Sequence, residues 1–337
     1  MIAITGGGTG GHLAIAKAIK EELNKRDVKP IFIGSNYGQD REWFESDEGF
    51  KEKYFFKTEG VVNKKGIKKI SSLLNILKYS KECKNIFEKN GIKAVFSVGG
   101  YSAAPSSIAS VIFRKKLYIH EQNSIKGNLN KILKPFSEAF FCSFDENSPV
   151  KNYPISEIFF KNARVREKVK SIIFLGGSQG AVFINDFAMN CAKELNKKGI
   201  KIIHQCGKRD FKRVKEFYET NEIEAEVFDF SKDIASFIKK ADFAVSRAGA
   251  SALFELAASA IPTLFIPYPY AASNHQYFNA KFLADKNLAF LKTQKELTKD
   301  DLFEFIDRDI KQISLQLKDL IQPNGAKEIV DYILKKI

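Results

Sequence analysis

The stretch TGGGTGGH at residues 5–12 follows a short apolar run and opens a segment with helical periodicity. A second stretch of this kind, LGGSQGA at residues 175–181, lies roughly midway along the chain. Glycines at such strand-to-helix turns let backbone N–H groups approach an anion, and the helix behind adds unpaired donors and the positive end of its dipole. The repetition predicts two similar strand–turn–helix domains that face one another, with a nucleotide-like ligand in the cleft.

The rest of the chain alternates short β-branched or aromatic runs with helical stretches, which is typical of βα units and parallel sheets. Besides the run before the first turn, the expected strands are residues 31–33, 95–98, 117–119, 139–142, 172–175, 201–203, 226–228, 243–245 and 263–266.

The domain boundaries follow from a stretch between residues 147 and 170 that contains Pro149 and Pro154 and no long periodic element. We expect an N-terminal domain over residues 1–150, a linker over 151–170 and a C-terminal domain over 171–320. Residues 321–337 contain a helix-like segment that either closes the second domain or packs back on the first.

The composition excludes several classes of protein. The net charge of +14, from 54 Lys and Arg against 40 Asp and Glu, favours a polyanionic partner, but no nucleic-acid-binding motif accompanies it. The four cysteines have no metal or disulfide spacing, which indicates a cytoplasmic protein. We expect no secretion signal and no spanning helix, because no basic leader is present and no apolar run approaches about 18 residues.

Two nucleotide-binding motifs fit the first turn poorly. The glycines at 6, 8 and 11 match the dinucleotide fingerprint, but the second strand ends in Gly34-Ser35 and not in an acidic residue. A P-loop would need Lys and Ser or Thr where His12 and Leu13 stand. Asp307-Arg308-Asp309 resembles a metal-binding motif, but its region has a helical pattern, in which residues two apart point to different faces. We expect neither a metal nor a cofactor.

Several polar residues are candidates for ligand contact. His12 is either a general base or a hydrogen-bonding partner within its loop. The cluster HEQN at residues 120–123 directly follows an apolar strand, which favours ligand contact. Glu255 lies on the helix opened by residues 249–251, where it either accepts both hydroxyls of a ribose or is solvated. Ser178 fits an N-cap, a ligand contact or both.

Six motifs together resemble one family. They are GGGTGGH at 6–12, SVGGY at 97–101, HEQN at 120–123, GGSQGA at 176–181, SRAGAS at 246–251 and NHQY at 274–277. In this order they resemble the MurG family, bacterial enzymes that add N-acetylglucosamine to undecaprenyl-diphosphate-linked muramyl-pentapeptide. The resemblance covers residues 5–280.

The resemblance implies two Rossmann-like parallel-sheet domains facing across a cleft (the GT-B fold), UDP-N-acetylglucosamine as donor, and an inverting transfer that converts lipid I to lipid II in peptidoglycan synthesis. It also implies a peripheral protein on the cytoplasmic face of the inner membrane. The alternatives are a GT-B glycosyltransferase with another lipid acceptor, such as diacylglycerol, and a non-catalytic nucleotide or nucleic-acid binder.

The resemblance also implies roles for individual residues. His12 would be the general base, and Arg166, with Arg164 in reserve, would hold the diphosphate, because the family's GNPVR appears here as NARVR at 162–166. The other substrate-binding residues would be Thr9, Gly10, Gly11 and Asn123 around the sugar and diphosphate, Ser178 at the diphosphate, Phe230 and Ser231 at the uracil, Ala250 and Ser251 along the nucleotide, Glu255 at the ribose and Gln276 at the sugar hydroxyls.

A membrane-bound acceptor draws attention to residues 64–79. An apolar stripe there consists of Ile67, Ile70, Leu73, Leu74 and Leu77, and it begins among Lys64, Lys65, Lys68 and Lys69. This pattern is typical of an interfacial helix on anionic lipid, but also of a helix whose leucines belong to the core. We expect Ile67 and Ile70 to be exposed, and the four lysines to contact an anionic membrane surface.

Overall fold

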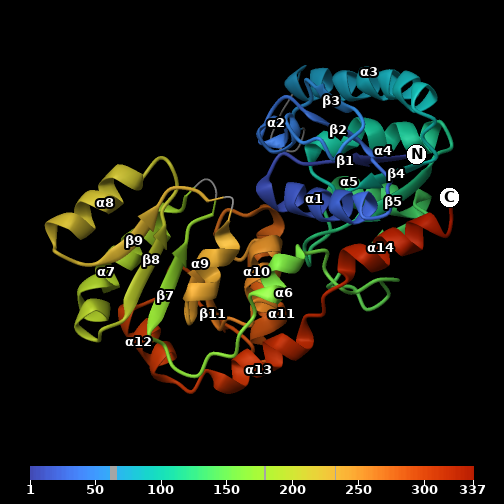
Figure 1. The fold of residues 1–337 in the computed structure, drawn as a ribbon. Coiled ribbons are helices and arrows are strands. Elements are labelled where there is room, and N and C mark those ends of the chain that lie inside the picture. Colours follow the sequence, from blue (N-terminus) through green and yellow to red (C-terminus); the bar gives the residue numbers. More distant parts are fainter. Residues whose placement is uncertain (61–66, 178–179, 232) are drawn as a thin grey trace. The chain divides into compact units, whose positions relative to one another are not determined.

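The computed structural model describes residues 1–60, 67–177, 180–231 and 233–337, which form two compact units (Figure 1). Unit 1 comprises residues 1–155 and 324–337, and unit 2 comprises residues 156–323. Each unit has a six-stranded sheet within the described residues, and every strand pair in both sheets is parallel. The predicted class, α/β with two parallel sheets, is confirmed.

The sheet of unit 1 has the order β3-β2-β1-β4-β5-β6. Its strands are β1 (Ile2–Thr5), β2 (Ile31–Ser35), β3 (Lys53–Phe56), β4 (Ala94–Ser97), β5 (Lys116–His120) and β6 (Ala139–Phe141). Its helices include α1 (Gly10–Asn24), α2 (Asp40–Phe44), α3 (Ile67–Lys89), α4 (Ala104–Ile112), α5 (Asn128–Leu133) and the 3₁₀ turns η1 (Tyr101–Ala103) and η2 (Lys134–Phe136). The central strands read as apolar runs because helices cover both faces of a parallel sheet.

The sheet of unit 2 has the order β12-β11-β10-β7-β8-β9. Its strands are β7 (Ser171–Leu175), β8 (Lys201–Gln205), β9 (Ala225–Phe228), β10 (Phe243–Ser246), β11 (Thr263–Phe265) and β12 (Phe290–Leu291). Its helices include α6 (Glu157–Lys161), α7 (Val182–Lys197), α8 (Phe211–Thr220), α9 (Ile234–Lys240), α10 (Ala250–Ala258), α11 (His275–Ala284), α12 (Lys299–Asp307), α13 (Lys311–Leu320) and the 3₁₀ turn η3 (Ala272–Asn274).

The strand order reverses once in each sheet, between β1 and β4 in unit 1 and between β7 and β10 in unit 2. In open parallel sheets, ligands bind outside the carboxyl ends of the strands at such a reversal. The two glycine-rich turns leave β1 and β7, so each turn lies at the reversal point of its own sheet.

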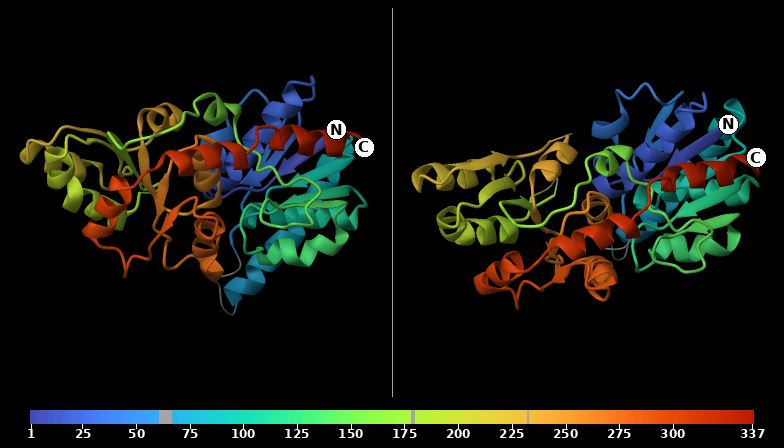
Figure 2. Two further views of the ribbon diagram at one scale, coloured as in Figure 1. Left: turned by 90° about the horizontal axis from the view of Figure 1, so that it is seen from below. Right: turned by 60° about the horizontal axis from the view of Figure 1, so that its bottom comes forward.

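The C-terminal helix α14 (Gly325–Leu334) belongs to unit 1, where it packs against α1. Arg26 in the loop after α1 forms an ion pair with Asp331 (2.7 Å), and Asn152 donates to the Glu328 carboxylate (3.0 Å). Figure 2 shows both chain termini near one another in this unit. The stretch expected to be a linker is divided at Ile155, because α6 already packs against α10 in unit 2.

Candidate active site

The first glycine turn is packed against the SVGGY motif within unit 1. The Gly7 N–H donates to the Gly99 carbonyl (3.2 Å), which links the end of β1 to the end of β4. Gly8 has a φ of +84°, and a Cβ there would lie 2.6 Å from the Tyr101 ring. In the SVGGY motif, a Cβ at Gly100 would lie 2.3 Å from the Gly7 carbonyl oxygen, so both motifs need glycines where the two loops approach closely.

His12 lies partly buried in the first turn of α1, held from two sides. Its Nδ1 is 2.9 Å from the Thr9 hydroxyl, and its Nε2 is 3.0 Å from the Gln122 amide nitrogen. Thr9 is the exposed N-cap residue of α1, and Gly10 and Gly11 are the first two residues of that helix. The structure thus brings Thr9 and His12 into one hydrogen-bonded group that includes Gln122.

Three residues of the HEQN cluster are buried, and Asn123 is partly buried. His120 ends β5 with 1% of its surface exposed, and burial, followed by the proximity of His12, lowers the pKa of His120 to about 3. His120 is therefore neutral and internal, and the prediction that the whole cluster contacts ligand is wrong for it.

Glu121 is also buried, and it shapes the loop that carries Asn123. Its carboxylate accepts the backbone N–H of Asn123 (3.0 Å), the N–H of Gly127 (2.8 Å) and the side-chain amide of Asn130 (2.9 Å). Glu121 is committed to these internal donors, so it also departs from the predicted ligand contact. Asn123 itself is partly buried in the loop that Glu121 holds.

The second glycine turn joins β7 to α7. The Gly176 N–H donates to the Gln205 carbonyl (3.1 Å) at the end of β8. Gly180 has a φ of +76°, and a Cβ there would lie 2.7 Å from the Cys206 carbonyl. Ser178, a predicted diphosphate ligand, and Gln179 lie outside the described residues.

Helix α10 carries three of the predicted nucleotide-binding residues. Ala250 and Ser251 form its first turn and are buried, and Glu255 follows one turn after Ser251 on the same face. Burial raises the pKa of Glu255 to about 8, and its carboxylate has no hydrogen-bond or ion-pair partner among the described residues. Glu255 is half-buried, and a partly desolvated carboxylate of this kind gains from a ligand that donates hydroxyl groups.

Arg166 does not have the geometry expected of a diphosphate ligand. The residue is 1% exposed, and its guanidinium donates to the backbone carbonyls of Arg164 (2.7 Å), Ala241 (3.2 Å), Ile238 (3.2 Å) and Ser259. Arg164, the reserve, forms an ion pair with Asp242 (2.7 Å). The resemblance alone could not reveal that both arginines are used to hold backbone segments of unit 2 together.

Arg247, directly after β10, is a cation that sequence reasoning left without a role. It donates to the carbonyls of Ile266 (3.0 Å) and Pro267 (3.2 Å), and its guanidinium lies 5.6 Å from the centre of the Tyr268 ring. Burial lowers the pKa of Arg247 to about 10, and it has no carboxylate partner among the described residues. Its position inside the SRAGAS motif, directly after a predicted strand, was the feature of the sequence that could have indicated a ligand contact.

Gln276 belongs to the first turn of α11. Its Oε1 accepts the Tyr268 N–H (2.9 Å), which fixes the proline-containing loop against the helix. Asn279, one turn further, is buried and donates to the Ala248 carbonyl (3.1 Å), so it ties α11 to the loop that opens α10. Asn279 was also missed, although it lies three residues after Gln276 and therefore on a neighbouring position of the same helix face.

Two further predictions concern the uracil and metals. Phe230 and Ser231 are partly buried just after β9, where the Ser231 hydroxyl accepts the Asp233 N–H (3.0 Å). In the described part of the chain, no group of His, Cys, Asp and Glu could hold a metal. Asp307 ends α12 and forms an ion pair with Lys198 (3.0 Å).

Helix α3 exposes apolar side chains, contrary to the alternative that its leucines fill the core. Ile70, Leu73, Leu74 and Leu77 are 46% to 61% exposed. Lys64 and Lys65 lie outside the described residues, as do the side chains of Ile67, Lys68 and Lys69. No described helix is long and apolar enough to cross a membrane.

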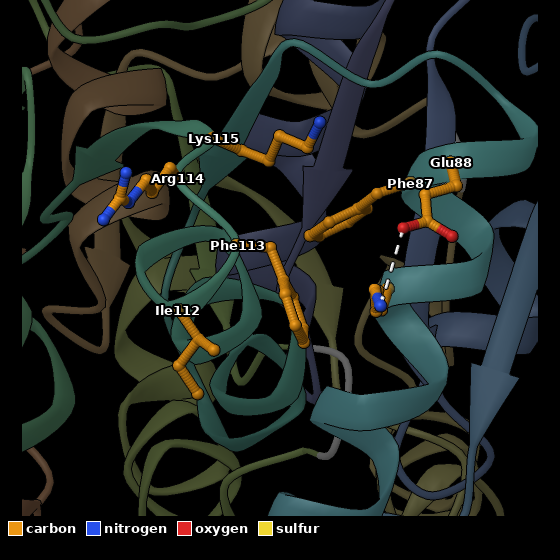
Figure 3. Close-up of a pocket in the computed structure, with 7 residues that line it drawn as sticks. Phe87, Glu88, Ile112, Phe113, Arg114 and Lys115 are labelled. Atoms are coloured by element: carbon orange, nitrogen blue, oxygen red, sulfur yellow. Dashed lines mark ion pairs between the residues drawn. The ribbon is translucent and has the colours of Figure 1, made fainter.

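A cavity of about 240 Å³ lies near the other end of α3, against the end of α4 (Figure 3). Its lining includes Phe87, Phe113 and Arg114, and Lys84 pairs with Glu88 across 3.8 Å. The lining contains none of the predicted site residues, so this cavity is separate from both glycine turns.

Comparisons with known proteins place the chain among glycosyltransferases. Residues 2–142 match the glycosyltransferase family 28 N-terminal domain, and residues 171–333 match the glycosyltransferase family 28 C-terminal domain. A crystal structure of MurG from Acinetobacter baumannii superposes with a TM-score of 0.80 at 26% identity, covering 99% of both chains. A glycotransferase of kitacinnamycin, 13% identical with a TM-score of 0.70, shares the fold. The fold and these matches define a glycosyltransferase of the GT-B class.

Two curated relatives specify the family. One from Campylobacter fetus is 57% identical over 337 residues, which are 100% of both chains. Another from Wolinella succinogenes is 50% identical over 333 residues, 99% of both chains. Both are named UDP-N-acetylglucosamine–N-acetylmuramyl-(pentapeptide) pyrophosphoryl-undecaprenol N-acetylglucosamine transferase. The chain belongs to the MurG family.

Proposed function

We propose that this chain transfers N-acetylglucosamine from UDP-N-acetylglucosamine to the 4-hydroxyl of undecaprenyl-diphosphate-linked muramyl-pentapeptide, the lipid I to lipid II step of peptidoglycan synthesis. The observation that carries the proposal is the 57% identity to a relative with that named activity along the whole of both chains. The unpartnered Glu255 carboxylate and the hydrogen-bonded His12 support it at the level of single groups.

In the donor site, unit 2 residues bind the UDP moiety. Glu255 accepts the two ribose hydroxyls with a half-buried carboxylate that has no partner among the described residues. Arg247 provides positive charge for the diphosphate in place of Arg166, since Arg166 is 1% exposed and donates to four backbone carbonyls, whereas Arg247 is partly exposed. The remaining donor contacts are those predicted from the sequence: Ser178, Ser231, Ala250, Ser251 and Gln276.

The transfer is one displacement with inversion. The acceptor hydroxyl attacks C1 of the sugar on the face opposite UDP, its proton passes to His12, and the C1–oxygen bond breaks with its electron pair going to UDP. The transition state is oxocarbenium-like, as in glycoside hydrolysis. Fixed donors and a cation at the diphosphate stabilise the charge that develops there. Thr9, Gly10, Gly11 and Asn123 contact the sugar.

The acceptor's polyprenyl tail keeps it in a bilayer, so the enzyme must reach the membrane surface. We infer that α3 makes this contact as a peripheral element on the cytoplasmic face of the inner membrane. The exposed Ile70, Leu73, Leu74 and Leu77 give it an apolar face, and the lysines at 64, 65, 68 and 69 add charge for anionic headgroups.

The test is UDP release from UDP-N-acetylglucosamine with the lipid-linked muramyl-pentapeptide, and with diacylglycerol as a second acceptor. Release that depends on the muramyl acceptor and yields a disaccharide product is the expected result. Release with diacylglycerol alone would assign the chain to another lipid acceptor, and UDP binding without release would make it a non-catalytic binder.

A further inference from the structure

A buried carboxylate lies directly behind the first glycine turn. Asp40, the first residue of α2, is fully buried and has no cationic partner among the described residues. Its Oδ1 accepts the Gly8 N–H (2.5 Å), and its Oδ2 accepts the Ser35 N–H at the end of β2 (2.8 Å). The two oxygens thereby connect the turn after β1 to the neighbouring strand.

The Asp40 carboxylate occupies space that side chains at Gly7 and Gly34 would otherwise fill. A Cβ at Gly7 would lie 2.5 Å from Asp40 Oδ1, and a Cβ at Gly34 would lie 2.8 Å from Oδ2. The Tyr101 ring lies against Gly8, so the turn is held between a carboxylate and an aromatic ring. The glycines at 7 and 34 serve this internal contact as well as the shape of the turn.

The contact changes what the first turn offers to a ligand. The Gly8 N–H is bonded to Asp40 and the Gly7 N–H to Gly99, so neither is directed at an external anion. The sequence alone predicted an anion-binding turn here. The structure instead gives residues 6–8 a supporting role, and leaves Thr9, Gly10, Gly11 and His12 as the groups that reach a substrate.

We propose that Asp40 is a positioning residue that fixes the first glycine turn so that Thr9 and His12 hold their reactive arrangement. The proposal rests on the proposed function. Thr9 directly follows Gly8, and its hydroxyl is 2.9 Å from His12 Nδ1, so a displaced Gly8 displaces the group that orients the imidazole. Asp40 itself touches no substrate.

The substitution Asp40→Asn tests this directly, because an amide offers one acceptor oxygen and turns an NH₂ toward the second backbone N–H. We expect kcat to fall at least tenfold (roughly the loss of one charge-assisted hydrogen bond), with KM for UDP-N-acetylglucosamine within about twofold. Asp40→Glu, which keeps two acceptors on a longer arm, should give an intermediate kcat.

A double-mutant cycle with His12→Gln separates positioning from general stability. If Asp40 acts through His12, Asp40→Asn should have little further effect on kcat in the His12→Gln background. Ile92→Ala or Ile92→Val, in the buried core of unit 1, provides a control with a matched loss of thermal stability. Additive losses in the cycle, or an equal kcat loss in the matched Ile92 variant, would overturn the proposal.

A second variant and a measurement without substrate cover the case in which Asp40→Asn does not fold. If Asp40→Asn does not fold, the same cycle is run with Asp40→Glu. Amide hydrogen exchange at Gly8 needs no substrate, and it should be markedly faster in the Asp40 variant than in the Ile92 control. Wild-type enzyme that releases no UDP with any acceptor would refute the proposed function, whereas unchanged Gly8 exchange in the variant would refute the Asp40 contact.

Discussion

Arg166 gives the sharpest contrast between the family resemblance and the structure. As a diphosphate ligand, it should matter for UDP affinity; as a buried organiser, it should matter for the stability of unit 2. Its guanidinium bonds to the carbonyls of Ile238, Ala241 and Ser259, and its backbone N–H donates to the Ser314 hydroxyl (3.0 Å). The substitution Arg166→Met keeps a long side chain and removes every guanidinium donor.

The expected loss of stability follows from the backbone carbonyls that lose a guanidinium donor. The Ser259 carbonyl loses its donor, at about 1–3 kcal/mol, whereas the Ile238 carbonyl keeps the Ala241 N–H (3.2 Å) and the Ala241 carbonyl keeps the Arg164 guanidinium (3.0 Å). These two each lose one bond of two, at about 0.5–1.5 kcal/mol, so the sum is about 2–6 kcal/mol. Part of this cost is offset, because Arg166→Met also removes a buried charge. Burial of that charge lowers the pKa of Arg166 to about 9. We therefore expect the lower half of this range, about 2–4 kcal/mol, which corresponds to a fall in Tm of about 4–16 °C for a unit of this size.

Calorimetric unfolding and UDP titration on the same preparations separate the two roles. Arg166→Met should lower the Tm of the unit 2 transition, while UDP affinity, measured well below that Tm, stays within about threefold. Arg247→Met is the matched comparison: it should weaken UDP binding more than uridine binding, because uridine lacks the diphosphate. A stable Arg166→Met protein that has lost tenfold or more in UDP affinity would refute the structural reading of Arg166.

Four further predictions address Glu255, His12 and the lysines before α3 and at its start. Glu255→Gln should weaken UDP binding about tenfold to a hundredfold when affinity is measured above pH 8, where the carboxylate is ionised. This is the cost of about 1.5–3 kcal/mol for a lost hydrogen bond to a charged group, and unchanged affinity at that pH would remove Glu255 from the ribose site. Because the folded state keeps a proton on Glu255 up to a pKa of about 8, whereas the ordinary value is 4.5, wild-type stability should fall as pH rises from 5 to 8, and urea unfolding of Glu255→Gln should lack that part of the fall. His12→Ala should lower turnover about 10²–10⁴-fold with donor affinity nearly unchanged; lost affinity with surviving turnover at saturation would make His12 a ligand of the phosphate or the loop. Changing Lys64, Lys65, Lys68 and Lys69 to Gln should reduce co-sedimentation with anionic vesicles and increase its sensitivity to salt, at about 1 kcal/mol per lysine, and wild-type binding by the folded variant would exclude this segment from membrane contact.

The fold was largely predictable because its signals are local. Each expected strand is a short run rich in β-branched or aromatic residues, and the structure has a strand at each of them, whereas β3 and β12 were missed. The strand β3 (Lys53–Phe56) has the aromatic run 54–56, a signal of the same kind as that of the expected edge strand β9, so its omission has no structural explanation. The strand β12 has two residues, too few for any periodicity.

The candidate site was less predictable, because burial decides what a polar residue does. His120 and Glu121 directly follow or end an apolar strand, as surface ligands do, yet both are internal. Nothing in their neighbouring residues distinguishes a carboxylate that meets a substrate from one that accepts the N–H groups of Asn123 and Gly127. That distinction depends on which loop folds over the strand end, a non-local property.

The two glycine turns show how a distant residue changes the meaning of a local motif. Both turns end a strand at the reversal point of a parallel sheet, and both open a helix. In unit 1 a buried carboxylate from α2 occupies the Gly8 N–H, which makes that turn a poor site for a second negative charge. In unit 2 the neighbouring strand end instead provides Arg247, a cation without a carboxylate partner among the described residues. Electrostatics therefore favours the donor's diphosphate in unit 2 and a neutral hydroxyl group beside His12 in unit 1. The two glycine patterns are alike and do not by themselves predict this difference.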